Sequence, residues 1–385
     1  MIPLKYNVRS LTVRWVTTLL TVLAIAIVVF ASILTFGMIE GIENALTSSG
    51  DPEDLIVMRK GADSELSSNV AATMARDLVN LEGVSRNSEG EPLASREFIT
   101  IMTSERRSSG TANVIVRGLD KIGRELRPDF TIVEGRDLES GVNELISSTR
   151  MASRFKNYGL GETAEINDTK FKVVGLFTAG GSAAESEVWA DLRDLTGAQR
   201  IEGAVSVVNM RISDEDKRVK IVDQIENSDQ FKLEAKTEAT YFDAQKSSAT
   251  PLRIIAYIIA GFLTVGAMFA AANTMYSAIA SRAREIGTLR ALGFSRSSVM
   301  TSFVLESILI CMLGGILGCL ATIPLNGITG GTSGSTFSEI TFSFSFGPKV
   351  LLRGILLALA MGLIGGLFPA LSAIRMQIVN ALRQR

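Results

Sequence analysis

The stretch Arg282–Gly293, RAREIGTLRALG, decides the fold of this chain because it lies between two long apolar segments. In that position it is a short loop of a membrane protein. Ile286, Leu289 and Leu292 nevertheless recur every three residues, close to helical spacing, among charged side chains. A loop of this length does not need an apolar stripe unless something packs against it. The pattern therefore predicts a docking helix that transmits force to or from a partner.

Four apolar segments approach or exceed the roughly 20 residues that a helix needs to cross a bilayer. We expect them to be transmembrane helices at residues 15–39, 254–276, 301–325 and 350–371. The first is longer than the usual apolar core of a signal peptide, roughly 7–15 residues. Its length favours an uncleaved anchor over a cleavable signal peptide.

Lysine and arginine are unevenly distributed over the segments that flank these spans. They occur in residues 1–14, 277–300 and 372–385, whereas residues 326–346 contain neither. Short cytoplasmic loops are enriched in Lys and Arg. Both termini and the segment at 277–300 are therefore expected in the cytoplasm, and the loop at 326–349 is expected on the other side of the membrane.

The long segment between the first two spans, residues 41–250, then lies on the extracytoplasmic side. Its helical and strand patterns mix without a regular βαβ rhythm, so we expect a large α+β domain that buries its own core. The expected elements are helices at 69–81 and 214–227 (the latter with Val219, Val222 and Ile225 as its apolar face), strands at 98–102, 114–117 and 205–212, and a hairpin of 163–166 with 171–177 around Asn167 and Asp168.

Two helical patterns bound this domain. Residues 39–48 continue the first span without a helix breaker, and residues 239–249 lead into the second span. We therefore place the domain at residues 40–250 and expect both spans to extend outward as a helical stalk. Ordinary linkers are the alternative, because Gly41 and Gly50 weaken a helix.

The sequence lacks the residues that several kinds of catalysis, metal binding and nucleotide binding require. It contains no histidine, which is the commonest general base and zinc ligand, and no GxxxxGK[ST], GxSxG, HExxH or CxxC motif. The net charge of −1 gives no field that would attract nucleic acid. Cys311 and Cys319 would lie about 12 Å apart on a helix, too far for a disulfide. We therefore expect no catalytic residue, metal site or cofactor in this chain, and we do not expect the protein to be an enzyme.

Small residues mark the third and fourth spans. Gly314 and Gly318, and likewise Gly362 and Gly366, form small-xxx-small patterns that let helices approach closely in a membrane. They indicate a packing seam, either between two copies of the chain or within one bundle. The alternative is that glycine is simply common in such helices.

Glu306 stands about one and a half turns into the third span, where an ionisable group is costly unless it is paired or near the interface. Arg290 or Arg296 is the expected partner. No trail of polar residues crosses the bilayer. That absence argues against an ion channel or a substrate path through the middle of the membrane.

One span, a large outer domain and three further spans with an Arg-Glu-Ile-Gly loop form an arrangement that resembles the permease subunits of the MacB/FtsX-like ABC transporter family. The most specific match is REIGTLRALG at residues 284–293. EGRDL at 134–138 and VVGLF at 173–177 are similar to parts of the MacB-type periplasmic core domain. GGLFPA at 365–370 is similar to the end of the last span of the family.

The resemblance implies that a separate ABC ATPase subunit binds ATP and Mg²⁺ and receives the loop. A homodimer, or a dimer with a related permease, would carry ATP-driven movement to the outer domain across a bacterial inner membrane, for export or extraction of a substrate. A periplasmic adaptor or chaperone stays open as a further partner. The residues to which the resemblance assigns ATPase coupling are Arg282, Arg284, Glu285, Ile286, Gly287, Leu289, Arg290, Leu292 and Gly293.

Two other functions stay open on the sequence. A receptor or scaffold would bind a ligand with the outer domain and use no ATP, and co-purification with an ATP-binding subunit would separate it from a permease. A membrane-anchored enzyme is disfavoured by the missing histidine and nucleophile motifs. The substrate is also open among drugs, peptides, lipoproteins, lipids and signals to an envelope enzyme.

Overall fold

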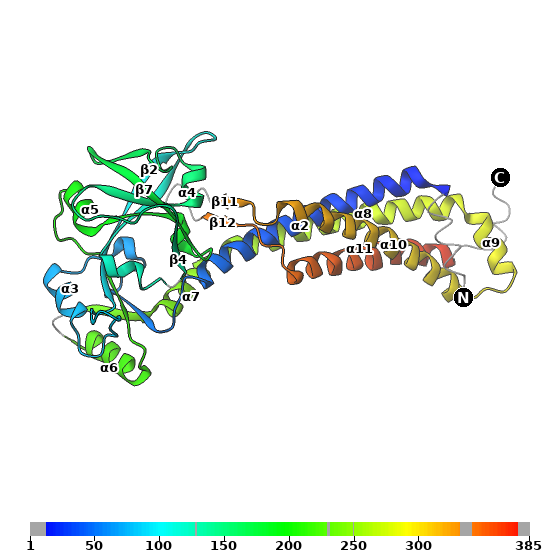
Figure 1. Cartoon of the computed structure of the whole chain (residues 1–385). Helices are drawn as coiled ribbons and strands as arrows, with labels where there is room; N and C mark the ends of the chain where they lie inside the picture. Colours follow the sequence, from blue (N-terminus) through cyan, green and yellow to red (C-terminus); the bar gives the residue numbers. More distant parts are fainter. Residues whose placement is uncertain (1–12, 128, 229–231, 249, 332–340, 376–385) are drawn as a thin grey trace. The chain divides into compact units, whose positions relative to one another are not determined.

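The computed structural model describes residues 13–375 apart from 128, 229–231, 249 and 332–340 (Figure 1). The chain divides into two units. We call them the membrane unit, with residues up to 40, 250–328 and from 344 onward, and the outer unit, with residues 41–249 and 329–343. Parts of the expected N-terminal segment 1–14, loop 326–349 and tail 372–385 lie outside the described residues.

Long apolar helices form the membrane unit. Four of the described helices are long and apolar enough to cross a membrane, and the outer domain lies between the first and the second of them in the sequence. The predicted fold class is therefore confirmed. The helices are α2 (Trp15–Thr47), α8 (Thr250–Ser281), the short α9 (Ala283–Ala291), α10 (Arg296–Thr322), followed by the 3-10 turn η4 (Ile323–Leu325), and α11 (Pro348–Arg375).

The glycines of the small-xxx-small patterns lie at close contacts between helices of the same chain. A Cβ on Gly314 would lie 2.8 Å from the Cβ of Ile25 on α2, and one on Gly318 would lie 2.8 Å from the carbonyl oxygen of Ala26. Gly362 and Gly366 of α11 make room for α10. A Cβ on Gly362 would lie 2.8 Å from the Cα of Ile308, and one on Gly366 would lie 2.5 Å from the Cβ of Ser307. A seam within one bundle therefore accounts for all four glycines.

We expect Gly314→Ala to destabilise the membrane unit, although alanine favours a helix over glycine by about 1 kcal/mol. The added methyl group would overlap α2, and overpacking of this kind costs about 1–3 kcal/mol. Gly266→Ala on α8 is the matched control, because no atom of another helix lies within 4 Å of a Cβ there. Thermal unfolding of the full chain in detergent should give a lower midpoint for G314A than for G266A. Equal midpoints would contradict the close seam.

One ten-stranded mixed sheet organises the outer unit, in the order β10-β1-β9-β2-β3-β8-β5-β7-β4, with β6 paired to β7. Neighbouring strands pair antiparallel except β3 with β8 and β5 with β7. The strands are β1 (Asp54–Arg59), β2 (Ala94–Glu105), β3 (Thr111–Leu119), β4 (Phe130–Gly135), β5 (Glu144–Ser148), β6 (Thr163–Ile166), β7 (Thr169–Ala179), β8 (Glu187–Asp191), β9 (Val207–Arg211) and β10 (Leu233–Thr237), and a separate pair joins β11 (Thr329–Gly331) to β12 (Thr341–Ser343).

Different helices cover the two ends of this sheet, so the outer unit has two lobes (Figure 1). One lobe packs α3 and α6 on β1, β9 and β10, and the other packs α4 and α5 on β3, β5, β7 and β8. The helices are α3 (Ala72–Val79), α4 (Thr149–Arg154), α5 (Leu192–Ala198), α6 (Glu215–Glu226) and α7 (Glu238–Ser248), with 3-10 turns η1 (Glu65–Ser67), η2 (Lys121–Arg124) and η3 (Ala183–Ser186).

The predicted hairpin is present, because β6 and β7 pair antiparallel. Asn167 and Asp168 connect them with φ angles of 46° and 68°, a left-handed turn that suits these residue types. The apolar face predicted for the helix at 214–227 is wrong in one position. Val219 is 64% exposed, and Ile221 is buried together with Ile225.

Candidate partner-docking site

The segment singled out in the sequence is a helix, α9, separated from both neighbours by breaks. Arg282, with φ −112° and ψ 17°, interrupts the backbone between α8 and α9. Glu285 in the first turn and Arg290 in the last complement the helix dipole. Gly293 follows the C-terminal end with φ +93°, a conformation that favours glycine. Ser295 then caps α10 by accepting a hydrogen bond from the Ser298 N–H.

The predicted apolar stripe does not form one exposed face. Ile286 is 3% exposed and packs in the hydrophobic core of the membrane unit, whereas Leu292 is 73% exposed and Leu289 is half-buried. Successive residues of a helix are about 100° apart, so each three-residue step drifts by about 60° and six residues by about 120°. Ile286 and Leu292 therefore point in different directions and do not share one exposed face, and their part in docking stays a prediction.

A different set of residues forms the exposed side of α9, which we call the outward face. It combines charged, polar and apolar side chains. On the inner side, Gly287 is buried next to Ile286. The outward face consists of Arg284, Glu285, Thr288, Ala291 and Leu292.

The structure pairs Glu306 with Arg282 rather than with the expected Arg290 or Arg296. Arg282 Nη1 lies 3.1 Å from a carboxylate oxygen of Glu306, and both side chains are buried. Arg290 instead donates a hydrogen bond of 3.2 Å from Nη1 to the carbonyl oxygen of Ile374 near the end of α11. The sequence indicated that Glu306 needs a partner, but not which arginine would reach it.

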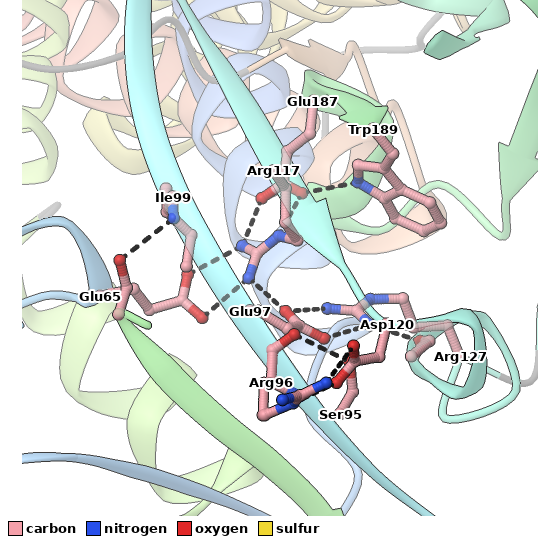
Figure 2. A network of polar contacts seen from close by, with 12 residues as sticks. Glu65, Ser95, Arg96, Glu97, Ile99, Arg117, Asp120, Arg127, Glu187 and Trp189 are labelled. Atoms are coloured by element: carbon pink, nitrogen blue, oxygen red, sulfur yellow. Dashed lines mark hydrogen bonds and ion pairs between the residues drawn. The ribbon is translucent and has the colours of Figure 1, made fainter. Parts of the chain in front are cut away.

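A second buried group of charges lies in the outer unit and was missed in the sequence. Figure 2 shows Arg117 of β3 between Glu65, Glu97 and Glu187, with nitrogen–oxygen distances of 2.9, 2.7 and 2.6 Å. Trp189 donates from Nε1 to Glu187 at 2.8 Å. These residues come from η1, β2, β3 and β8, so the network joins three neighbouring strands of the sheet and the turn η1.

Arg127 adds a second positive charge to this network, because its Nη1 lies 3.0 Å from a carboxylate oxygen of Glu97. Burial alone would raise the pKa of Glu97. The charges of Arg127 and Arg117 outweigh burial and lower that pKa to about 2. Glu97 is therefore ionised at neutral pH, and the network is built from ion pairs.

Glu238, the first residue of α7, behaves in the opposite way. Its carboxylate accepts a hydrogen bond of 3.2 Å from the Asp51 N–H. Burial raises the pKa of Glu238 to about 8, because the attraction of Arg127 is too weak to offset it and the nearby Asp54 raises it further. No cluster of three or more potential metal ligands occurs among the residues described in the structure.

We expect stability to decline as the pH rises from about 4.5 to about 8, because of Glu238. Its pKa is 4.5 in an ordinary setting and about 8 in the fold, so the folded chain holds the proton more tightly than the unfolded chain. That contribution is complete below pH 4.5 and is lost by pH 8. Glu238→Gln should therefore flatten the dependence of the unfolding midpoint on pH between 5 and 8. A variant with an unchanged pH dependence would contradict this account.

Two family models match the chain. Residues 257–378 match the C-terminal region of FtsX-like permeases, and residues 18–228, more than half of the chain, match the MacB-like periplasmic core domain. The chain belongs to the MacB/FtsX-like ABC transporter permease family. This permease therefore has the family's MacB-like core domain between its first and second membrane-spanning helices.

Curated relatives are named macrolide export ATP-binding/permease protein MacB. The permease is 22% identical over 324 residues to the one from Shewanella sp. (strain ANA-3), covering 77% of this chain and 48% of the relative. It is 24% identical over 333 residues to that of Campylobacter jejuni subsp. jejuni serotype O:2 (strain ATCC 700819 / NCTC 11168), covering 77% and 49%. The chain thus spans about half the length of these relatives.

Among solved structures, the periplasmic region of MacB from Actinobacillus actinomycetemcomitans is 11% identical, with a TM-score of 0.39. The match covers 53% of this chain and 97% of the chain in that structure.

Proposed function

We propose that this permease couples ATP hydrolysis by a separate ATP-binding subunit to a conformational change of its outer domain. In this mechanism the work is done outside the membrane, for export or extraction of a substrate from the envelope. Family membership supports the ATP-binding partner and a second permease copy. The 385 residues contain no GxxxxGK[ST] motif with which to bind ATP themselves.

The exposed outward face of α9 is the single observation that carries this proposal. Leu292 is a large apolar side chain left 73% exposed at the end of a short helix between two membrane spans. The arginines of the same segment favour the cytoplasmic side, where ATP is available. We propose that the outward face docks into the ATP-binding subunit, while Gly287 and Ile286 anchor α9 in the bundle.

The outer end of α2 supports transmission toward the outer domain. The helix continues without interruption from Trp15 to Thr47, through Gly41 and past the apolar stretch expected at 15–39. Helix α7 likewise covers Glu238–Ser248, just before α8. We propose that these helical segments form a stalk, with both termini of the chain in the cytoplasm and the domain at 40–250 outside the inner membrane.

Co-purification tests the proposal. The full-length chain, tagged and extracted in mild detergent from the membrane of its own cell, should retain an ATP-binding subunit in stoichiometric amount. The isolated complex should hydrolyse ATP. A chain that purifies with its fold intact but without any ATP-binding subunit would contradict the proposal and favour a receptor or scaffold.

A further inference from the structure

The break between α8 and α9 is a point where a movement of α9 would be absorbed. Arg282 leaves the helical conformation there, and backbone hydrogen bonds run across it from Arg282 N to Ile279 O and from Ile286 N to Arg282 O. If nothing else held α9, a push on its outward face would bend this break. The adjoining membrane helices would then stay where they are.

The side chain of Arg282 bridges the break. Its Nη1 lies 3.1 and 3.4 Å from the two carboxylate oxygens of Glu306 on α10, and its Nε lies 3.2 Å from Glu285 in the first turn of α9. The guanidinium also lies over the ring of Phe303, 5.7 Å from the centroid. One side chain at the break thus contacts both the helix that follows it and a neighbouring membrane helix.

Burial makes this contact costly to separate. The side chains of Arg282 and Glu306 are only 7% and 5% exposed. A buried ion pair adds little stability over a well-packed apolar pair, but removing one partner leaves an uncompensated charge that is strongly unfavourable. Such a pair is better suited to fixing one arrangement of helices than to adding net stability.

Two further contacts fix the rest of α9. Ile286 is buried in the core of the bundle, and Arg290 donates to the carbonyl oxygen of Ile374 on α11. The helix is therefore held to α10 near its start and to α11 near its end. The only described side of α9 that remains exposed is its outward face.

We propose that Arg282 and Glu306 are positioning residues that join α9 to α10, so that a displacement of α9 is passed to the membrane helices instead of bending the α8–α9 break. The inference rests on the proposed function and assigns the step between docking and movement. Neither residue is part of the outward face. Their loss should therefore uncouple the complex without dissociating it.

The test uses the full chain with its co-purified ATP-binding subunit in nanodiscs. A spin label on Ser48→Cys, the exposed residue directly after α2, reports the distance between two copies with and without a non-hydrolysable ATP analogue. In Glu306→Gln the fraction of complexes that shift should fall about tenfold, within the usual range of coupling between linked sites. The amount of bound ATP-binding subunit and its nucleotide binding should stay at the wild-type level.

Three further variants keep the test decisive. Arg282→Gln with Glu306→Gln removes both charges, so it avoids an unpaired buried charge, and it should be as uncoupled as the single variant. Arg282→Lys keeps the charge and should retain part of the shift. Glu40→Gln, which breaks the half-exposed Arg353–Glu40 pair of the same unit, should shift like the wild type.

The two proposals fail in different ways. A wild-type complex that shows no nucleotide-driven shift overturns the proposed function and this inference with it. A normal shift in both Glu306→Gln and the double variant overturns the inference alone. Loss of the bound ATP-binding subunit in the double variant would also overturn it, because these residues would then act in docking.

Discussion

Arg117→Met is expected to lower the free energy of unfolding of the outer unit by about 3–5 kcal/mol, the usual cost of breaking a buried ion pair from one side. The substitution leaves the carboxylates of Glu65, Glu97 and Glu187 close together without their shared cation. Arg127 remains beside Glu97, whereas Glu65 loses both hydrogen bonds that Arg117 donates to its carboxylate. The remaining like charges repel one another in a region that excludes water.

The effect can be followed by the fluorescence of Trp189, which is buried and bonded to Glu187. The chain contains two tryptophans, so Trp15→Phe gives a background with a single reporter. Arg107→Met is the matched control. Arg107 pairs with Glu162 at 2.8 Å, but both side chains are more than a third exposed, and such pairs contribute roughly 0–1 kcal/mol. If urea unfolding of the full chain shows equal losses for the two variants, the network does not have the role assigned to it.

Leu292→Asp is expected to reduce capture of the ATP-binding subunit by more than about tenfold, because burying an unpaired carboxylate in an interface costs about 2 kcal/mol or more. The fold should be unaffected, since Leu292 is 73% exposed. Ile286→Asp should behave differently. It places a charge in the core of the bundle, so the chain itself should be lost from the membrane or unfold at lower temperature.

Val219→Asp controls for the chemistry of the Leu292 substitution. Val219 is also a large exposed apolar residue, at 64%, but it lies on α6 of the outer unit. The measurement is the amount of ATP-binding subunit that co-purifies per permease chain, with the melting temperature of each variant beside it. If the Leu292→Asp and Val219→Asp chains retained equal amounts of the ATP-binding subunit, the outward face would not be the docking surface.

The sequence predicted the helices and strands whose patterns depend on residues close together in the chain. Long apolar runs located the four membrane helices, and alternation with an Asn-Asp turn located the β6–β7 hairpin. Helical periodicity located α3, α6 and α9. Strands β1, β5 and β8 were missed because they are short and buried on both faces, so their side chains do not alternate between polar and apolar.

The sequence predicted that the candidate site is a helix, but it did not predict which side of that helix is exposed. Three-residue spacing fits a helix loosely, and only the packing of α9 on the bundle decides that Ile286 points inward. The partner of Glu306 depends on where the α8–α9 break places Arg282. The network around Arg117 joins residues far apart in the chain, from Glu65 to Glu187, so no local sequence pattern predicts it.

Amide hydrogen exchange of the wild-type complex tests the central claim, that ATP bound by a separate subunit changes the outer domain, most directly. Exchange reports local opening of the backbone, so it can be followed in α7 and at the outer end of α2. These amides should change their protection when nucleotide is added to the complex, and should not respond when nucleotide is added to the permease alone. Identical exchange with and without nucleotide in the complex would contradict the account.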